Sequence, residues 1–155
     1  MKSKNKYFYP VDISKFKINY KDSPAHKGRL KYSVDFIVPQ GTPVYAAAKG
    51  EIVWIRNNSK KGGPFKKYWL KGNRIVIKHK NKEYTAYEHL KYKSSLVKLG
   101  DNVKKGQLIA YSGNTGYSFC PHLHFEVFHN PCKDKSEGET LQISWLSRGK
   151  IKFLS

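Results

Sequence analysis

Short apolar runs separated by polar turns fill most of the chain and predict β-strands rather than helices. Runs such as "DFIV", "EIVWI", "RIVIK" and "YTAYE" are rich in β-branched and aromatic residues, and polar or glycine-containing turns separate them. No segment sustains the period of about 3.6 residues that an amphipathic helix needs, and residues 90–99 supply at most one short helix or turn. The pattern therefore predicts an all-β fold with long loops.

Two pairs of consecutive runs are expected to form hairpins. The runs "NRIVIKH" and "YTAYEHL" flank the turn "KNKE", and alternating residues in both are apolar. The stretch "VKLGDNVKKGQLIAYSG", residues 97–113, is predicted to be a second hairpin, because glycine marks both of its turns. Such connections favour antiparallel pairing of the strands.

The ends of the chain differ from its middle. Residues 1–24, rich in lysine and tyrosine, are expected to be an irregular lead-in, and residues 147–155 a C-terminal tail. Residues 25–146 are then one domain, which suits a chain of 155 residues. No apolar run approaches the length of a membrane span, and the basic N-terminus shows no signal-peptide pattern.

The stretch "CPHLHFEVF" places two histidines two positions apart in one predicted strand. Because side chains alternate across a strand, His122 and His124 point to the same face, roughly 6–7 Å apart, and Leu123 and Phe125 to the other. Two imidazoles on one face are either polar residues of a solvated surface or part of a metal or proton-transfer site.

Three further residues favour the metal site. Asp35 lies inside the apolar run "YSVDFIV", where a buried carboxylate needs hydrogen-bond donors or a cation. His26 lies in the loop "SPAHKGRL", and His89 ends the strand "YTAYEHL". Zinc binds histidine nitrogens and carboxylate oxygens, and three protein ligands leave a position open for chemistry, whereas four close a structural site. From the residues alone, His122 is either a fourth ligand or a free group.

Five segments, in order, resemble the lysostaphin/LytM-type zinc metallopeptidases, which are cell-wall endopeptidases built on the duplicated-hybrid-motif barrel. They are "HKGRLKYSVDF", "GTPVYAAAKGEIVWI", "YTAYEHL", "GDNVKKGQLIAYSGNTG" and "PHLHFEV", within residues 26–131. The resemblance implies a compact antiparallel β-barrel or sandwich. It also implies a zinc-dependent endopeptidase that hydrolyses peptide bonds in the stems or cross-bridges of peptidoglycan.

The resemblance also assigns roles to the polar positions. It implies that His26, Asp35 and His124 bind one zinc ion per chain. It further implies that His89 and His122 act on the substrate as catalytic residues, with His122 free of the metal. The zinc ion would activate a water molecule and polarise the scissile carbonyl, while the two histidines handle protons.

Some residues depart from the family pattern or match none of it. His79 and His129 match no motif position and are expected to be structural or surface residues. Cys120 precedes His122 by two positions, so it either faces the site as a thiol or replaces a small residue. A strand between Cys120 and Cys132 would hold them roughly 20 Å apart, well beyond the roughly 7 Å that a disulfide spans.

Two insertions leave the substrate preference open. The loop of residues 56–72 is longer than the turn common in the family and carries five lysines together with Phe65, Tyr68 and Trp69. These aromatic side chains either form a binding rim or fold back onto the core. A second insertion, "CKDKSEGET", follows the histidine-containing strand and is rich in acidic residues.

Charge is the strongest signal in the composition. The chain has 30 lysine and arginine residues against 11 acidic ones, which gives a net charge of +19. Such a chain is expected to bind polyanions, here peptidoglycan or another anionic cell-wall polymer on the extracellular or periplasmic side, unless the charge serves solubility alone. No specific nucleic-acid partner is expected, because no nucleic-acid-binding motif accompanies the charge.

Two other classes of protein fit parts of the sequence. A barrel of the same family that has lost its zinc would act as a binding or regulatory module, but such proteins usually lack a ligand that is present here. The stretch "GDNVKKGQLIAYSG" also resembles hairpins of biotinyl, lipoyl and sugar-phosphotransferase carrier proteins. The pairing of His26 with Asp35 argues against a carrier.

Overall fold

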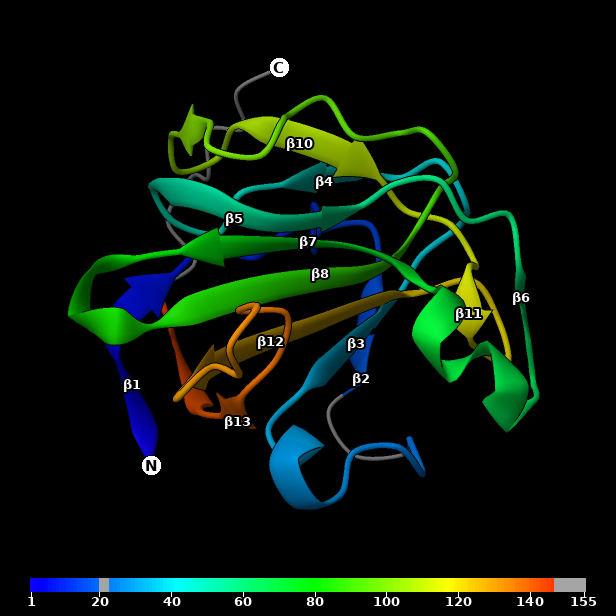
Figure 1. Cartoon of the computed structure of the whole chain (residues 1–155), viewed down its shortest axis with the longest axis horizontal. Helices are drawn as coiled ribbons and strands as arrows, with labels where there is room; N and C mark the ends of the chain where they lie inside the picture. Colours follow the sequence, from blue (N-terminus) through cyan, green and yellow to red (C-terminus); the bar gives the residue numbers. More distant parts are fainter. Residues whose placement is uncertain (20–22, 147–155) are drawn as a thin grey trace.

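The computed structural model describes residues 1–19 and 23–146, and it contains short strands joined by loops (Figure 1). Its strands are β1 (Lys2–Tyr7), β2 (Lys17–Asn19), β3 (Val34–Ile37), β4 (Pro43–Tyr45), β5 (Gly50–Arg56), β6 (Gly62–Gly63), β7 (Asn73–Lys78), β8 (Tyr84–Leu90), β9 (Asn102–Val103), β10 (Leu108–Tyr111), β11 (Gly116–Tyr117), β12 (Leu123–His129), β13 (Glu139–Thr140) and β14 (Gln142–Trp145). Three short 3-10 helices complete the elements: η1 (Gly28–Leu30), η2 (Lys66–Lys71) and η3 (Lys80–Lys82). The predicted all-β class is confirmed.

One large sheet organises the molecule. Its strands follow the order β2-β3-β12-β8-β7-β5-β9, with β13 paired to β12, and every pair in it is antiparallel. Strands β4 and β10 pair with each other in a separate two-stranded sheet, which is drawn above β5 in Figure 1. This arrangement agrees with the compact antiparallel barrel or sandwich expected from the sequence.

The two faces of the large sheet have different roles. On β12, Leu123, Phe125 and Val127 are fully buried and join the main hydrophobic core. The alternate residues, His124 and Glu126, point to the other face, as the period of two residues requires. That second face carries the polar side chains described below and a smaller apolar cluster.

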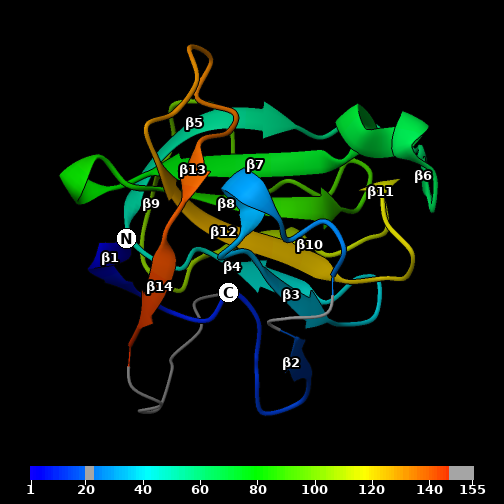
Figure 2. The ribbon, with the colours of Figure 1, turned by 90° about the horizontal axis from the view of Figure 1, so that it is seen from below.

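Two expectations about the chain were wrong. The lead-in was expected to be irregular, but β1 pairs in parallel with β14 at the edge of the molecule (Figure 2), and β2 pairs with β3. Lysines at alternate positions of β1 point outward and hide its strand pattern, whereas Ser3 and Tyr7 are buried. The predicted hairpin of residues 97–113 does not form either, because β9 pairs with β5 and β10 pairs with β4.

The remaining elements are short. Of residues 90–99, Leu90 ends β8 and the rest form a turn and irregular backbone, whereas residues 66–71 of the long loop form the 3-10 helix η2. Within the described ranges, no helix has the length and apolar character needed to cross a membrane. The predicted C-terminal tail, residues 147–155, lies outside the described residues.

Candidate metal centre and active-site cleft

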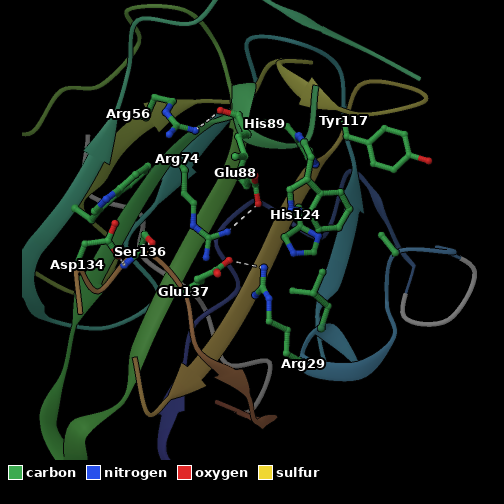
Figure 3. Close-up of a pocket in the computed structure, with 15 residues that line it drawn as sticks. Arg29, Arg56, Arg74, Glu88, His89, Tyr117, His124, Asp134, Ser136 and Glu137 are labelled. Carbon is green, nitrogen blue, oxygen red and sulfur yellow. Dashed lines mark hydrogen bonds and ion pairs between the residues drawn. The ribbon is translucent and has the colours of Figure 1, made fainter. Parts of the chain in front are cut away.

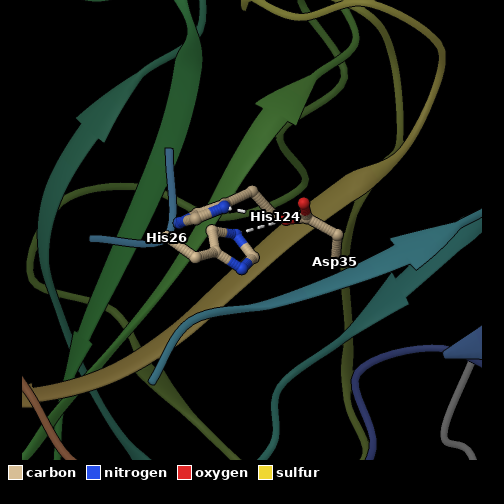
Figure 4. A group of neighbouring side chains, drawn as sticks. All are labelled: His26, Asp35 and His124. Atoms are coloured by element: carbon tan, nitrogen blue, oxygen red, sulfur yellow. Dashed lines mark hydrogen bonds and ion pairs between the residues drawn. The ribbon is translucent and has the colours of Figure 1, made fainter. Parts of the chain in front are cut away.

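Three side chains from separate parts of the chain meet on the polar face of the large sheet (Figure 4). Asp35 of β3 and His124 of β12 are direct cross-strand partners, and His26 reaches them from the loop before η1. Nε2 of His26 lies 3.2 Å from Oδ1 of Asp35, and Nδ1 of His124 lies 2.9 Å from the same oxygen. One ligand atom of each residue lies within 4.8 Å of the other two.

The residues fit a zinc ion by their chemistry and their burial. The side chains of His26, Asp35 and His124 are only 4%, 9% and 7% exposed. Two imidazole nitrogens and one carboxylate oxygen are a donor set that zinc accepts, and three protein ligands leave a coordination position open. The structure therefore brings together all three ligands expected from the sequence.

The electrostatics of this group also favour a cation. Burial raises the pKa of Asp35, but hydrogen bonds from His124 and His26 outweigh that effect and hold this pKa well below its usual range. Burial lowers the pKa of His124, but hydrogen bonds to Asp35 and Glu126 raise it to about 10. The carboxylate thus stays charged, and His124 keeps a proton for which a metal ion would compete.

His122 and His89 lie beside the three predicted ligands but are held differently. Nδ1 of His122 donates a hydrogen bond to the carbonyl of Cys120 over 2.8 Å, and Nδ1 of His89 donates one to the carbonyl of Thr115 over 2.6 Å. Because Nδ1 of each ring carries the proton, the Nε2 lone pair of each neutral ring is free. The two ring centroids are 4.5 Å apart.

Both histidines are neutral at neutral pH in this setting. Burial lowers the pKa of His89 to about 4. Burial also lowers the pKa of His122, although the charge of Asp35 opposes the shift. Nε2 of His122 lies 3.8 Å from Oδ1 of Asp35, farther than either His26 or His124.

A β-bulge aims His89 at the site. Strict alternation along β8 would place His89 with Tyr87 in the core, on the face opposite to Glu88. The pairing of β8 with β7 skips His89, since Glu88 pairs with Arg74 and Leu90 with Asn73. His89 has φ of 63°, and both it and Glu88 line the same cleft. Bulges of this kind often re-aim a side chain next to an active site.

A chain of buried charges behind the centre was not anticipated from the sequence. Nη1 of Arg74 lies 2.8 Å from Oε2 of Glu88, and Nη2 lies 2.6 Å from Oε1 of Glu126. Oε2 of Glu126 lies 3.4 Å from Nε2 of His124. The signal that singled out Asp35, a charge inside an apolar strand, is also present at these three positions.

A cleft of about 240 Å³ opens next to this group (Figure 3). Trp69 and Leu70 of η2 line one part of it together with Tyr117, and Asp134 and Glu137 of the second insertion line another. The rest of its lining is Ala25, Arg29, Leu30, Trp54, Arg56, Arg74, Glu88, His89, His124 and Ser136. Both insertions therefore shape the cleft, and Trp69, which lines it and is 42% exposed, favours the binding rim over the alternative of folding back onto the core.

The comparison with family models decides the family. The model described as Peptidase family M23 matches residues 29–136, which is more than half of the chain. The chain belongs to peptidase family M23. His26 lies three residues before the matched segment, whereas Asp35, His89, His122 and His124 lie inside it.

Curated relatives of this M23 chain are named for peptidoglycan. It is 40% identical over 125 residues to the peptidoglycan DD-endopeptidase ShyA of Vibrio cholerae, and the alignment covers 77% of this chain and 26% of ShyA. It is 38% identical over 155 residues to ShyB of the same organism, covering 95% of this chain and 34% of ShyB. The M23 chain thus spans about a third or less of the length of these relatives.

Solved structures agree with this assignment. Lysostaphin from Staphylococcus simulans is 32% identical and superimposes with a TM-score of 0.62, covering 89% of this chain and 51% of that one. A zinc-containing peptidase from Vibrio cholerae is 36% identical with a TM-score of 0.57, covering 79% and 36% of the two chains. The fold of the M23 chain is therefore that of lysostaphin-type peptidases.

His79 and His129 belong to neither the predicted metal group nor the cleft lining. His79 is buried and bonds the carbonyl of Lys49 and the hydroxyl of Thr85, and His129 lies 3.4 Å from a carboxylate oxygen of Glu139. Both cysteines of this M23 chain are exposed and free. Cys120 meets His122 through its backbone carbonyl.

Proposed function

We propose that this chain is a zinc-dependent endopeptidase that hydrolyses peptide bonds in the stems or cross-bridges of peptidoglycan, on the extracellular or periplasmic side of the cell. The observation that carries the proposal is the convergence of His26, Asp35 and His124 on one point beside a cleft, with His89 and His122 next to them. Zinc, when bound by the first three, supplies a Lewis acid that polarises a carbonyl and acidifies a water molecule.

The two remaining histidines supply proton transfer. His122 offers the lone pair of Nε2 while its Nδ1–H is held by the carbonyl of Cys120, so it can accept a proton from the attacking water as general base. His89 offers a second Nε2 at the neighbouring ring. A proton held at either Nε2 is then available to the leaving amine.

Peptidoglycan as the substrate rests on the relatives and on the charge. ShyA and ShyB are named as peptidoglycan DD-endopeptidases. The net charge of +19 suits a substrate embedded in an anionic polymer, because unlike charges concentrate the protein on its surface. The aromatic and apolar side chains of η2 give the cleft a wall against which a peptide can pack.

Digestion of purified peptidoglycan with the zinc-supplied protein tests the proposal. Mass spectrometry should reveal new amino and carboxyl termini within stem peptides or cross-bridges. His122→Ala should abolish most of these products, whereas His129→Ala, which changes a histidine outside the site, should leave them unchanged. New sugar ends, or no new termini, would contradict the proposed endopeptidase.

A further inference from the structure

A line of buried charged groups runs from the predicted metal centre into the large sheet. Glu126 is fully buried, and its two oxygens face different partners: Oε2 lies 3.4 Å from Nε2 of His124, and Oε1 lies 2.6 Å from Arg74. Arg74, whose side chain is 9% exposed, also lies 2.8 Å from Glu88. The three residues come from neighbouring strands, β7, β8 and β12.

We propose that Glu126 is a positioning residue that holds His124 ready for zinc, and that Arg74, braced by Glu88, holds Glu126 in place. This inference rests on the proposed zinc function of His124. It concerns residues outside the predicted metal group of His26, Asp35 and His124. Their expected contribution is the affinity of the site for zinc.

The two nitrogens of the His124 ring explain the role of Glu126. Nδ1 lies 2.9 Å from Oδ1 of Asp35, the same oxygen that Nε2 of His26 approaches at 3.2 Å. Glu126 lies at the opposite nitrogen, so its carboxylate accepts a hydrogen bond from Nε2–H. A proton fixed on Nε2 leaves the Nδ1 lone pair directed at the metal position, and a carboxylate partner makes the ring a stronger ligand.

Arg74 explains how a carboxylate can remain charged in this place. Nη2 of Arg74 lies 2.6 Å from Oε1 of Glu126, so the buried carboxylate has a hydrogen-bonded cation as its partner. A guanidinium group donates from two separate nitrogens in a fixed plane, and here one nitrogen meets Glu126 and the other meets Glu88. A lysine has no such planar fork and would present one nitrogen in place of the two that meet Glu126 and Glu88.

The chain offers a matched control for a buried glutamate. Glu83 is 3% exposed and accepts hydrogen bonds from the Tyr7 hydroxyl and from backbone amides of β1. It is not among the residues that line the cleft or form the predicted metal group. Glu83→Gln should therefore lower the stability of the fold without changing the affinity for zinc.

The test measures the zinc dissociation constant by competition with a chelator of known affinity. Relative to the unchanged protein, Glu126→Gln should bind zinc about 10- to 100-fold more weakly, as loss of such outer partners does elsewhere. Arg74→Lys should weaken binding by a smaller factor, because it keeps a charge but loses the fork. Glu83→Gln should match the unchanged protein, and circular dichroism selects the variants that are folded.

The unchanged protein supplies a second measurement that needs no variant. Nitrogen-15 NMR of its zinc-loaded histidines should place the proton of His124 on Nε2. The positioning role would be overturned if folded Glu126→Gln binds zinc as tightly as the unchanged protein does, or if the proton of His124 is found on Nδ1. Either result would leave the proposed function intact. Failure of the unchanged protein to bind zinc would overturn both.

Discussion

His122 and His124 stand two residues apart, yet their Nδ1 atoms meet different partners. Nδ1 of His124 points to the carboxylate of Asp35, whereas Nδ1 of His122 is held by a backbone carbonyl. The first arrangement suits a metal ligand, and the second leaves a neutral imidazole whose Nε2 lies 3.8 Å from Oδ1 of Asp35. Two identical side chains, one in β12 and one just before it, thus have different hydrogen-bond partners, which supports the different roles proposed for them.

The distinction predicts the behaviour of His122→Ala. Zinc should remain bound, and turnover of a peptide substrate should fall about 10²- to 10⁴-fold, the usual contribution of general acid–base catalysis. Steady-state kinetics on the zinc-loaded variant, with metal analysis of the same sample, measures both. Loss of zinc from this variant would show that His122 is a fourth ligand in a closed, structural site.

His79 gives the fold a dependence on pH that is separate from the site. Burial lowers the pKa of His79 from about 6.5 to about 4, so unfolding takes up a proton between these values. The free energy of unfolding should therefore fall as pH drops from 6.5 to 4, by on the order of 3 kcal/mol from this residue. Urea unfolding measured at several pH values in this range gives the free energy of unfolding as a function of pH. This free energy should depend less on pH in His79→Gln, and the same pH dependence in both proteins would refute the contribution.

At the scale of the elements, the sequence predicted the central strands and not their irregularities. The apolar alternation identified the segments that form β5, β7, β8 and β12. It could not predict the bulge at His89, because a bulge depends on the register between two strands. The strand β1 was missed because its lysines conceal the two-residue period, and the pairings of β9 and β10 depend on contacts distant in the sequence.

The part of the candidate site that could be predicted is the part that single residues in the sequence indicate. Asp35 inside an apolar strand and the two spaced histidines pointed to a metal group, and the structure brings the expected residues together. Arg74, Glu88 and Glu126 carry the same signal, but each is explained only by the other two across strand pairs. A charged residue in an apolar strand indicates that it has a partner, but it does not indicate where in the sequence that partner lies.

We expect the 3-10 helix η2 to contribute to substrate binding separately from the histidines of the site. Trp69 is 42% exposed, lines the cleft and lies 5.8 Å from the ring of Tyr117. Trp69→Ala should raise KM roughly 2- to 10-fold with little change in kcat, since an aromatic contact contributes about 0.5–1.5 kcal/mol. Leu96→Ala, which removes another exposed apolar side chain away from the cleft lining, is the control. A fall in kcat at unchanged KM would contradict a binding role.

Across the whole molecule, the charge of the cleft differs from that of the surface. Three arginines and three acidic residues line the cleft, although the chain as a whole carries +19. Among the described residues, only Lys15, Arg29 and Arg74 of the lysines and arginines form ion pairs with carboxylates. The excess positive charge is therefore distributed outside the cleft, where it can bind an anionic polymer.

This distribution predicts that salt separates attachment from chemistry. Exposed charges are screened over about 8 Å at physiological ionic strength, and over shorter distances in more salt. Raising the salt concentration should weaken binding to intact sacculi, measured by co-sedimentation, and leave turnover of a small uncharged peptide nearly unchanged. If binding to sacculi and turnover of the peptide both fall, the lysines contribute to the catalytic step. If neither falls, the positive charge serves solubility alone.

The metal content of the purified protein tests the proposed centre most directly. After exposure to zinc and removal of the excess, plasma mass spectrometry should find one zinc ion per unchanged chain. His124→Ala, measured beside it, should retain far less than one, because it removes one of three ligands. A folded, unchanged chain that holds no zinc, or a His124→Ala variant that holds as much as the unchanged chain, would contradict a centre built on His26, Asp35 and His124.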